Sequence, residues 1–137
     1  GATLWGSRIG AGGGYDLIMV GNDGAMRVDV GALQRRVTQP EYLRVVRSLV
    51  ESGIGSAVDL FSTYVGDRAS MAATLDGAEM NLDRNFRVQY LAGLAANRTD
   101  HELIFTGLVA DRRFPDAMFI APAPWKDSLR VALGRTR

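Results

Sequence analysis

One apolar stretch limits the fold more than any other part of this sequence. Residues 15–21 are nearly all apolar and lie between Gly14 and the turn-forming residues Asn22, Asp23 and Gly24. A short apolar run between turn residues is typical of a strand, and the absence of alternation favours burial on both faces, as in an α/β sheet. We therefore expect a buried strand here, around which the remaining chain packs.

Two shorter strands are expected beside it. Residues 3–5 have strand character, and residues 26–29 follow the Asn-Asp-Gly turn. The turn favours a hairpin between 15–21 and 26–29 at a sheet edge. Residues 6–14 are rich in glycine and are expected to form a flexible connection.

Helix-start signals dominate after residue 29. Asp29 can cap a helix that reaches Val37. The next helix ends at Gly53, and Thr38 and Glu41 have the spacing of a capping box at its start. Ser56 can cap a third helix up to Gly66. Further helices are expected at 68–75, at 91–96, from a second capping box at 99–102 to a stop at 114–115, and at 125–133. Residues 86–90 alternate like a strand. The expected inward positions are Tyr42, Val45, Val46, Leu49, Val50, Leu60, Phe61, Tyr64, Val65, Leu103, Ile104, Leu108 and Val109.

These elements predict an α/β protein that is strand-rich over 1–29 and mainly helical over 30–137. The length of 137 residues fits one domain, and a hydrophobic content of 47% with 23% charged residues is typical of soluble globular proteins. The chain begins almost inside a strand, which predicts a domain fragment rather than a natural N-terminus.

Composition excludes several kinds of site and partner. The absence of cysteine excludes disulfides, zinc–thiolate sites and iron–sulfur clusters. A net charge of +1 gives no general attraction to nucleic acid. No apolar run approaches the roughly 18–20 residues of a membrane helix. We expect a cytoplasmic chain without a metal, a nucleic-acid partner or a membrane segment.

Two possible signals for catalysis or cofactor binding are weak. The glycines at 10–14 precede a strand rather than a helix, so a flexible connection is favoured over a phosphate-binding loop. His101 is the only histidine, and it has no obvious nucleophile or ligand partner nearby in the sequence. No catalytic or cofactor-binding residue is predicted.

A dense polar group remains as the candidate substrate-binding site. Asn81, Asp83, Arg84 and Asn85 lie within five positions, just before an apolar and aromatic run. Asp83 could bind a cationic amine and Arg84 an anion. The alternative, which the frequency of polar residues in turns favours, is that these side chains fix a turn.

At these residues the sequence resembles a known family. Residues 81–92 resemble the segment near the C-terminal end of spermidine synthase-like proteins, the polyamine aminopropyltransferases, especially the large bacterial members fused to membrane segments. That family commonly has Thr at the position of Leu82, a second Asp at Arg84, Glu at Gln89, and a Pro that is missing here. Over residues 3–95 the order of strands and helices also fits the end of its Rossmann-like sheet and the C-terminal helices that follow.

The resemblance implies a part rather than a whole enzyme. The family's glycine-rich loop for decarboxylated S-adenosylmethionine and its catalytic aspartate have no counterpart in this chain, so the chain is expected to be inactive alone. It would complete a larger enzyme or assembly, with the remainder of the parent protein or a second copy as its partner. A homo-oligomer is expected, and the parent protein could be membrane-associated.

Two other hypotheses stay open. The chain could be a non-catalytic protein-interaction module with a helical core and an exposed β edge. It could also be a small self-sufficient enzyme that uses Asp83 and His101.

Overall fold

The computed structural model describes residues 1–6, 16–95, 98 and 100–134. The strands are β1 (Ala2–Gly6), β2 (Leu17–Gly21), β3 (Val28–Asp29), β4 (Tyr64–Asp67) and β5 (Phe119–Ile120). The helices are α1 (Val30–Val37), the 3₁₀ turn η1 (Pro40–Tyr42), α2 (Leu43–Glu51), α3 (Ala57–Ser62), α4 (Ala72–Leu75), α5 (Arg87–Ala95), α6 (His101–Ala110) and α7 (Ala123–Gly134). The protein is therefore mixed α/β, with more helix than strand.

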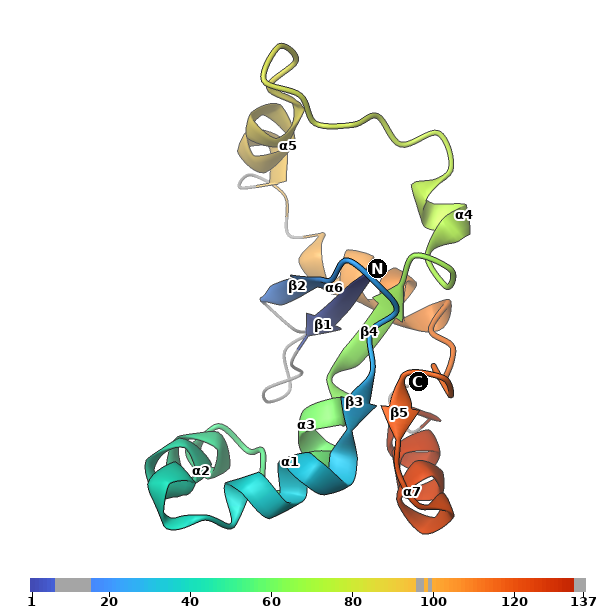
Figure 1. The fold of residues 1–137 in the computed structure, drawn as a ribbon. Helices are drawn as coiled ribbons and strands as arrows, with labels where there is room; N and C mark the ends of the chain where they lie inside the picture. Colours follow the sequence, from blue (N-terminus) through green and yellow to red (C-terminus); the bar gives the residue numbers. More distant parts are fainter. Residues whose placement is uncertain (7–15, 96–97, 99, 135–137) are drawn as a thin grey trace.

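β1 is the central strand of the larger sheet. It pairs antiparallel with β2 on one side and with β4 on the other, while β3 and β5 form a separate parallel pair (Figure 1). The strand expected at 26–29 thus exists as β3, but the hairpin between it and β2 is wrong. β1 pairs with β2 instead, and hydrogen bonds between Gly1 and Asn22 extend this ladder beyond the strand ends.

The expected burial of β2 on both faces is also wrong. β2 lies at the edge of the sheet, and the exposed fractions of Ile18 and Met19 are 63% and 74%. The described part of the chain has no layer that covers both faces of this strand. β2 has the sequence of an interior strand and the position of an edge strand.

Three predicted helix boundaries are confirmed. The Asp29 carboxylate accepts a hydrogen bond from the Ala32 amide at 2.8 Å and caps α1. The Ser56 hydroxyl accepts one from the Asp59 amide at 3.1 Å and caps α3. Gly53 ends α2 with a φ of +80°, a conformation that favours glycine.

Other boundaries differ for local reasons. Thr38 does not cap the next helix, because its hydroxyl donates to the Arg35 carbonyl at 2.8 Å and closes α1. The helix after Ser56 stops at Ser62, since residues 64–67 join the sheet as β4, and the helix expected at 68–75 is reduced to α4. Residues 87–90 belong to α5 rather than to a strand.

The core lies between α1, α3, α7, β4 and the β3–β5 pair. Its buried members are Val30, Ala57, Phe61, Tyr64, Met118, Phe119, Leu129 and Leu133. The rings of Phe61 and Phe119 are 5.4 Å apart, and Trp5 packs edge-on against Tyr64 at 5.5 Å. Arg112 donates hydrogen bonds to the carbonyls of Tyr64 and Leu133, which joins β4 to α7.

Several expected inward positions lie outside this core. Val45, Val50, Leu103 and Ile104 are all exposed. On α6 it is Phe105 that is buried, against β1, where a Cβ added at Gly6 would lie 2.8 Å from its ring. Gly6 therefore permits close packing of α6 on the sheet.

A truncation pair on α7 tests the core assignment. Leu129 is fully buried, whereas the exposed fraction of Val131 is 49%. We expect Leu129→Ala to lower the free energy of unfolding by about 2–5 kcal/mol, through lost burial and a cavity. Val131→Ala should change it by less than about 0.5 kcal/mol. Urea denaturation of both variants measures this, and equal losses would contradict the assignment.

Candidate functional site

The predicted site residues all lie on one projecting segment. We call residues 76–95 the arm: it consists of the connection 76–86, which has no helix or strand, and of α5. In Figure 1 the arm leaves α4, arcs away from the sheet and carries α5 at a distance from the core. Asn81, Asp83, Arg84 and Asn85 are all part of the connection.

Asn85 holds the turn that precedes α5. Its side-chain oxygen accepts hydrogen bonds from the amides of Leu82 at 3.0 Å and Arg87 at 3.3 Å. Its side-chain nitrogen donates to the Met80 carbonyl at 2.9 Å. These bonds satisfy backbone groups that a helix start leaves without partners.

Asn81 completes this cap. Its side-chain oxygen accepts a hydrogen bond from the Val88 amide at 3.0 Å. Between the two asparagines and the helix, Phe86 adopts a φ of +46°, which is strained for a residue with a side chain. An exposed ion pair between Glu79 and Arg87 at 2.9 Å also spans the turn. These contacts support the turn interpretation for Asn81 and Asn85.

Asp83 and Arg84 have no such role. Both side chains are exposed, and within the described residues neither makes a hydrogen bond or an ion pair. Their binding of a substrate stays a prediction. His101 begins α6, outside the arm, whereas Asp83 lies on the arm. The two residues of the small-enzyme hypothesis are therefore on different parts of the molecule.

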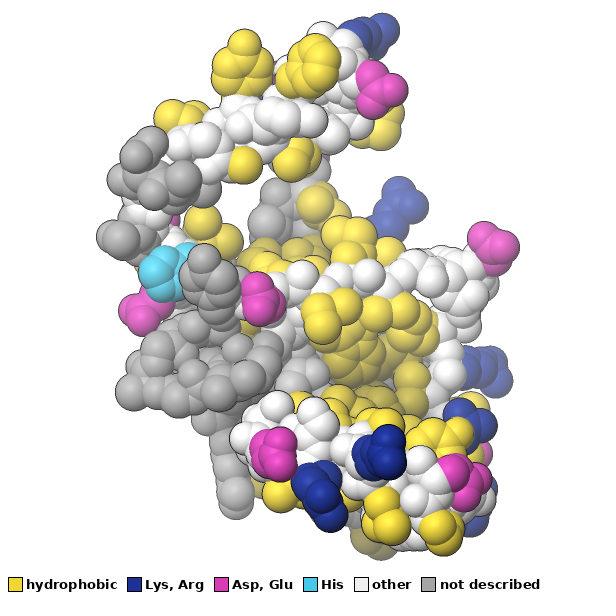
Figure 2. All heavy atoms as spheres, turned by 90° about the vertical axis from the view of Figure 1, so that its left-hand side faces the viewer, with side chains coloured by type: hydrophobic (Ala, Val, Ile, Leu, Met, Phe, Trp, Pro, Cys, Tyr) yellow, Lys and Arg dark blue, Asp and Glu magenta, His cyan; other side chains and the backbone are white. Residues whose placement is uncertain are grey.

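The surface of α5 is the unexpected feature of the arm. Arg87 and Gln89 are its only charged or amide residues, and its large apolar side chains are exposed on one half of the helix, with Gln89 and Gly93 on the other half. These side chains are Val88, Tyr90, Leu91 and Leu94, and Met80 and Phe86 before the helix are exposed as well. Figure 2 shows hydrophobic side chains along the arm and in the middle of the face below it. An apolar helix face of this kind is normally packed against a core or a partner.

Sequence reasoning missed this feature because it assigned residues 86–90 to a strand. The composition of 87–95 carried the signal, since seven of its nine residues are apolar or glycine. An apolar helix next to a polar turn indicates a surface for association rather than a catalytic site.

A buried phenol, Tyr64, and a half-buried carboxylate, Asp67, lie on β4 beside β1. The Tyr64 hydroxyl is buried and makes no hydrogen bond of normal geometry to a described residue, although Asp67 and Ser70 are close. Burial, followed by the nearby Asp67 carboxylate, raises the pKa of Tyr64 well above its usual value, so the phenol stays neutral. Burial also acts on Asp67, but the amides of Ser70 and Ala69, which donate to its carboxylate at 2.9 and 3.0 Å, and the nearby hydroxyls outweigh burial and lower the pKa of this carboxyl. A neutral phenol and a satisfied carboxylate offer no general base.

An open hollow of about 420 Å³ lies next to this pair. Its charged lining consists of Arg27, Arg68, Asp67 and Asp116. Two positive and two negative side chains cancel, so the hollow has no net charge to attract an ion. Among the residues that the structure describes, no group of three or more His, Asp or Glu side chains could hold a metal ion. None of the described helices is long and apolar enough to cross a membrane.

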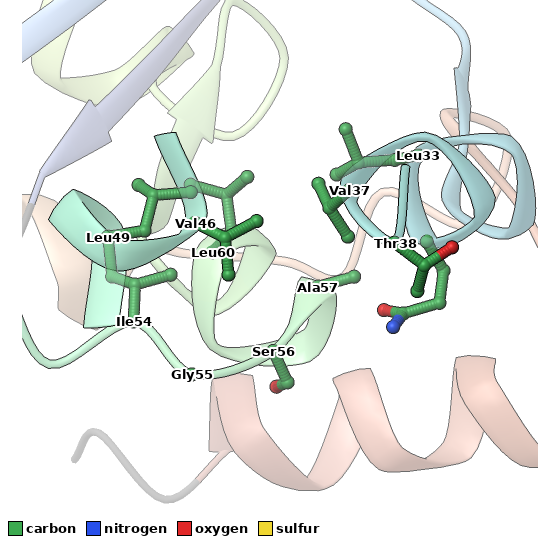
Figure 3. A pocket seen from close by; sticks show the side chains of 11 residues that line it. Leu33, Val37, Thr38, Val46, Leu49, Ile54, Gly55, Ser56, Ala57 and Leu60 are labelled. Carbon is green, nitrogen blue, oxygen red and sulfur yellow. The ribbon is translucent and has the colours of Figure 1, made fainter. Parts of the chain in front are cut away.

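A smaller, apolar cavity of about 150 Å³ lies where α1, α2 and α3 meet (Figure 3). Six large aliphatic side chains and Ala57 line it; the six are Leu33, Val37, Val46, Leu49, Ile54 and Leu60. The hydroxyls of Thr38 and Ser56 also line it, but Thr38 donates to Arg35 and Ser56 to Asp59. The cavity is a packing gap beneath α2 without reactive groups.

Comparison with protein-family models, with curated proteins and with solved structures finds no match to this chain. The glycine cluster at 10–14 and Thr99, the cap of the second capping box, lie outside the described residues. The functional interpretation therefore depends on the surface of the arm and on the sequence resemblance of that same segment.

Neighbouring valines on α2 test the cavity. Val46 lines it, whereas Val45 is exposed. Val46→Leu should raise the free energy of unfolding by about 0.5–2 kcal/mol relative to Val45→Leu. Both substitutions change helix propensity equally, but only the leucine at position 46 fills part of the cavity. Urea denaturation gives both values, and equal changes would contradict the presence of the gap.

Two substitutions in the turn test its assigned role. Asn85→Ala should weaken α5 by about 1 kcal/mol, the usual cost of losing a helix cap. Asp83→Asn should leave α5 unchanged, because the Asp83 side chain is exposed and makes no hydrogen bond or ion pair with a described residue. Hydrogen exchange of the α5 amides measures both effects, and faster exchange in Asp83→Asn would show a structural role for that carboxylate.

Proposed function

We propose that this chain is the C-terminal, non-catalytic part of a larger spermidine synthase-like protein, and that the arm docks on the remainder of that protein. The observation that carries the proposal is α5, a helix whose large apolar side chains are all exposed. Because Val88, Leu91 and Leu94 lie with Tyr90 on one half of the helix, a partner can bury all four side chains from one side. Its partner is therefore a body with an apolar cleft that receives this face of the helix.

The exposed surface of the whole chain supports a missing partner. The chain exposes 9977 Å². A compact monomer of 14.8 kDa exposes about 7,000 Å². The difference of about 3,000 Å² is larger than the roughly 800 Å² that each partner buries in an ordinary stable interface. The chain thus has enough uncovered area for more than one contact.

The family assignment within this proposal comes from the arm's sequence. The segment that resembles the aminopropyltransferases, 81–92, is the same segment that the fold leaves outside the core. Its asparagines hold a turn, and the turn presents Asp83 and Arg84 in front of α5. In the complete protein the turn would lie at the edge of the docking cleft, where these two charges could contact a substrate.

A second candidate function is an interaction module that binds an unrelated protein. The exposed β2 edge favours it, because an unpaired strand can accept a strand from a partner. The segment encoded upstream of Gly1 distinguishes the two candidates. It contains a glycine-rich cofactor loop under the first proposal, whereas an unrelated domain would support the second.

Binding between the chain and the separately produced upstream segment tests the docking role of the arm. Leu94 on α5 and Leu43 on α2 have the same exposed fraction, 60%. Leu94→Lys should weaken binding at least about tenfold, because a charge enters the apolar interface. Leu43→Lys should bind as the unchanged chain does. Isothermal calorimetry measures the affinities, and circular dichroism checks that both variants fold.

Equal affinity of the Leu94→Lys variant and the unchanged chain would show that α5 does not dock. An upstream segment without a cofactor loop would remove the family assignment while leaving the docking role to be decided by the calorimetry.

A further inference from the structure

The outer edge of β2 has a defined set of free backbone groups. Gly1 and Asn22 exchange hydrogen bonds, Asn22 donating at 2.7 Å, so they form a hydrogen-bonded pair of the β1–β2 ladder. Hydrogen-bonded pairs recur at every second residue of an antiparallel ladder. Val20 and Ile18, opposite Thr3 and Trp5, therefore bond to β1. The amides and carbonyls of Leu17, Met19 and Gly21 point away from β1.

This edge lacks the usual protection against pairing. Edge strands of natural proteins commonly carry a charge, a proline or a bulge. β2 has the sequence Leu-Ile-Met-Val-Gly, and its pairing with β1 has no register shift. No described strand pairs with its outer edge, and its side chains are exposed on both faces. A strand of this kind is a template for another strand.

We propose that β2 pairs antiparallel with β2 of a second copy of this chain, with Met19 opposite Met19. The two three-stranded sheets then form one sheet of six strands with a two-fold axis between the central methionines. The register follows from the outward groups, because Leu17, Met19 and Gly21 of one copy meet Gly21, Met19 and Leu17 of the other. Every outward amide and carbonyl of the three residues gains a partner.

Side-chain chemistry agrees with this register. Ile18 lies opposite Val20 on one face, and the methionines lie beside the leucines on the other, so all new neighbours are apolar. One step beyond the strand, Asp16 lies opposite Asn22 of the second copy. Its carboxylate therefore faces an amide instead of a second carboxylate. A register displaced by two residues would place an acid opposite an apolar residue, either Asp16 opposite Val20 or Asp23 opposite Leu17.

The pairing also accounts for the sequence of β2. An apolar strand with no alternation suits the middle of a sheet. In the six-stranded sheet β2 is an interior strand, with β1 on one side and its symmetry copy on the other. The uncovered area of about 3,000 Å² exceeds the roughly 800 Å² per partner that a stable dimer needs.

A charge-exchange experiment at Met19 tests both the dimer and its register. The 137-residue chain should sediment as a dimer at equilibrium. Met19→Lys and Met19→Glu should each raise the dimer dissociation constant at least about tenfold, because like charges lie directly opposite across the axis. A mixture of the two variants should recover a dimer, since lysine then faces glutamate. Recovery also shows that both variants are folded.

The arm provides the matched control. Leu94→Lys introduces the same charge on an exposed apolar residue away from β2, and it should leave the dimer intact. Loss of docking in Leu94→Lys with an unchanged dimer would separate this proposal from the proposed function.

Three results would overturn the proposal. A monomeric unchanged chain at high protein concentration would exclude the dimer. A dimer that persists in Met19→Lys would place the interface elsewhere. Failure of the Lys–Glu mixture to associate would exclude the register centred on Met19.

Discussion

Backbone pairing along β1 is the constraint on which the rest of this structure depends. β1 holds β2 and β4 in one sheet, and Trp5 on its core face packs against Tyr64 of β4. Tyr64 belongs to the same core cluster as Phe61. Arg112 donates hydrogen bonds to the carbonyls of Tyr64 and Leu133, and these bonds connect β4 to α7. Because β1 is the middle strand, its loss would separate the apolar edge from the core. The same arrangement places β2 and the arm at the periphery, where the proposed contacts are.

The sequence predicted the fold class and several helix starts, because these depend on local chemistry. Asp29 and Ser56 cap their helices through bonds within three residues, and Gly53 supplies its own backbone conformation. The failures involve distant partners. The Thr38 side chain bonds to the end of α1 and not to the start of the next helix. Residues 64–67 form a strand because they pair with β1. Local propensity does not contain that information.

Prediction of the candidate site shows the same division. The turn interpretation of Asn81 and Asn85 needed only neighbouring amides, and the structure contains those bonds. Substrate binding by Asp83 and Arg84 stays a prediction, because within the described residues neither side chain makes a hydrogen bond or an ion pair. The burial of β2 was predicted wrongly for a related reason: its composition is that of an interior strand, which this chain alone leaves at an edge.

The arm separates, along the sequence, two groups of residues that form one core. Val30, Ala57 and Phe61 precede residue 76, whereas Met118, Phe119 and Leu129 follow residue 98, and these side chains form one cluster. The backbone connection through the arm therefore contributes little to holding that cluster together. A chain cut between Gly77 and Asn85 keeps every core contact, so the two pieces have the design of a split protein that reassembles from fragments. Insertion of a foreign domain at the same place would leave the core intact for the same reason.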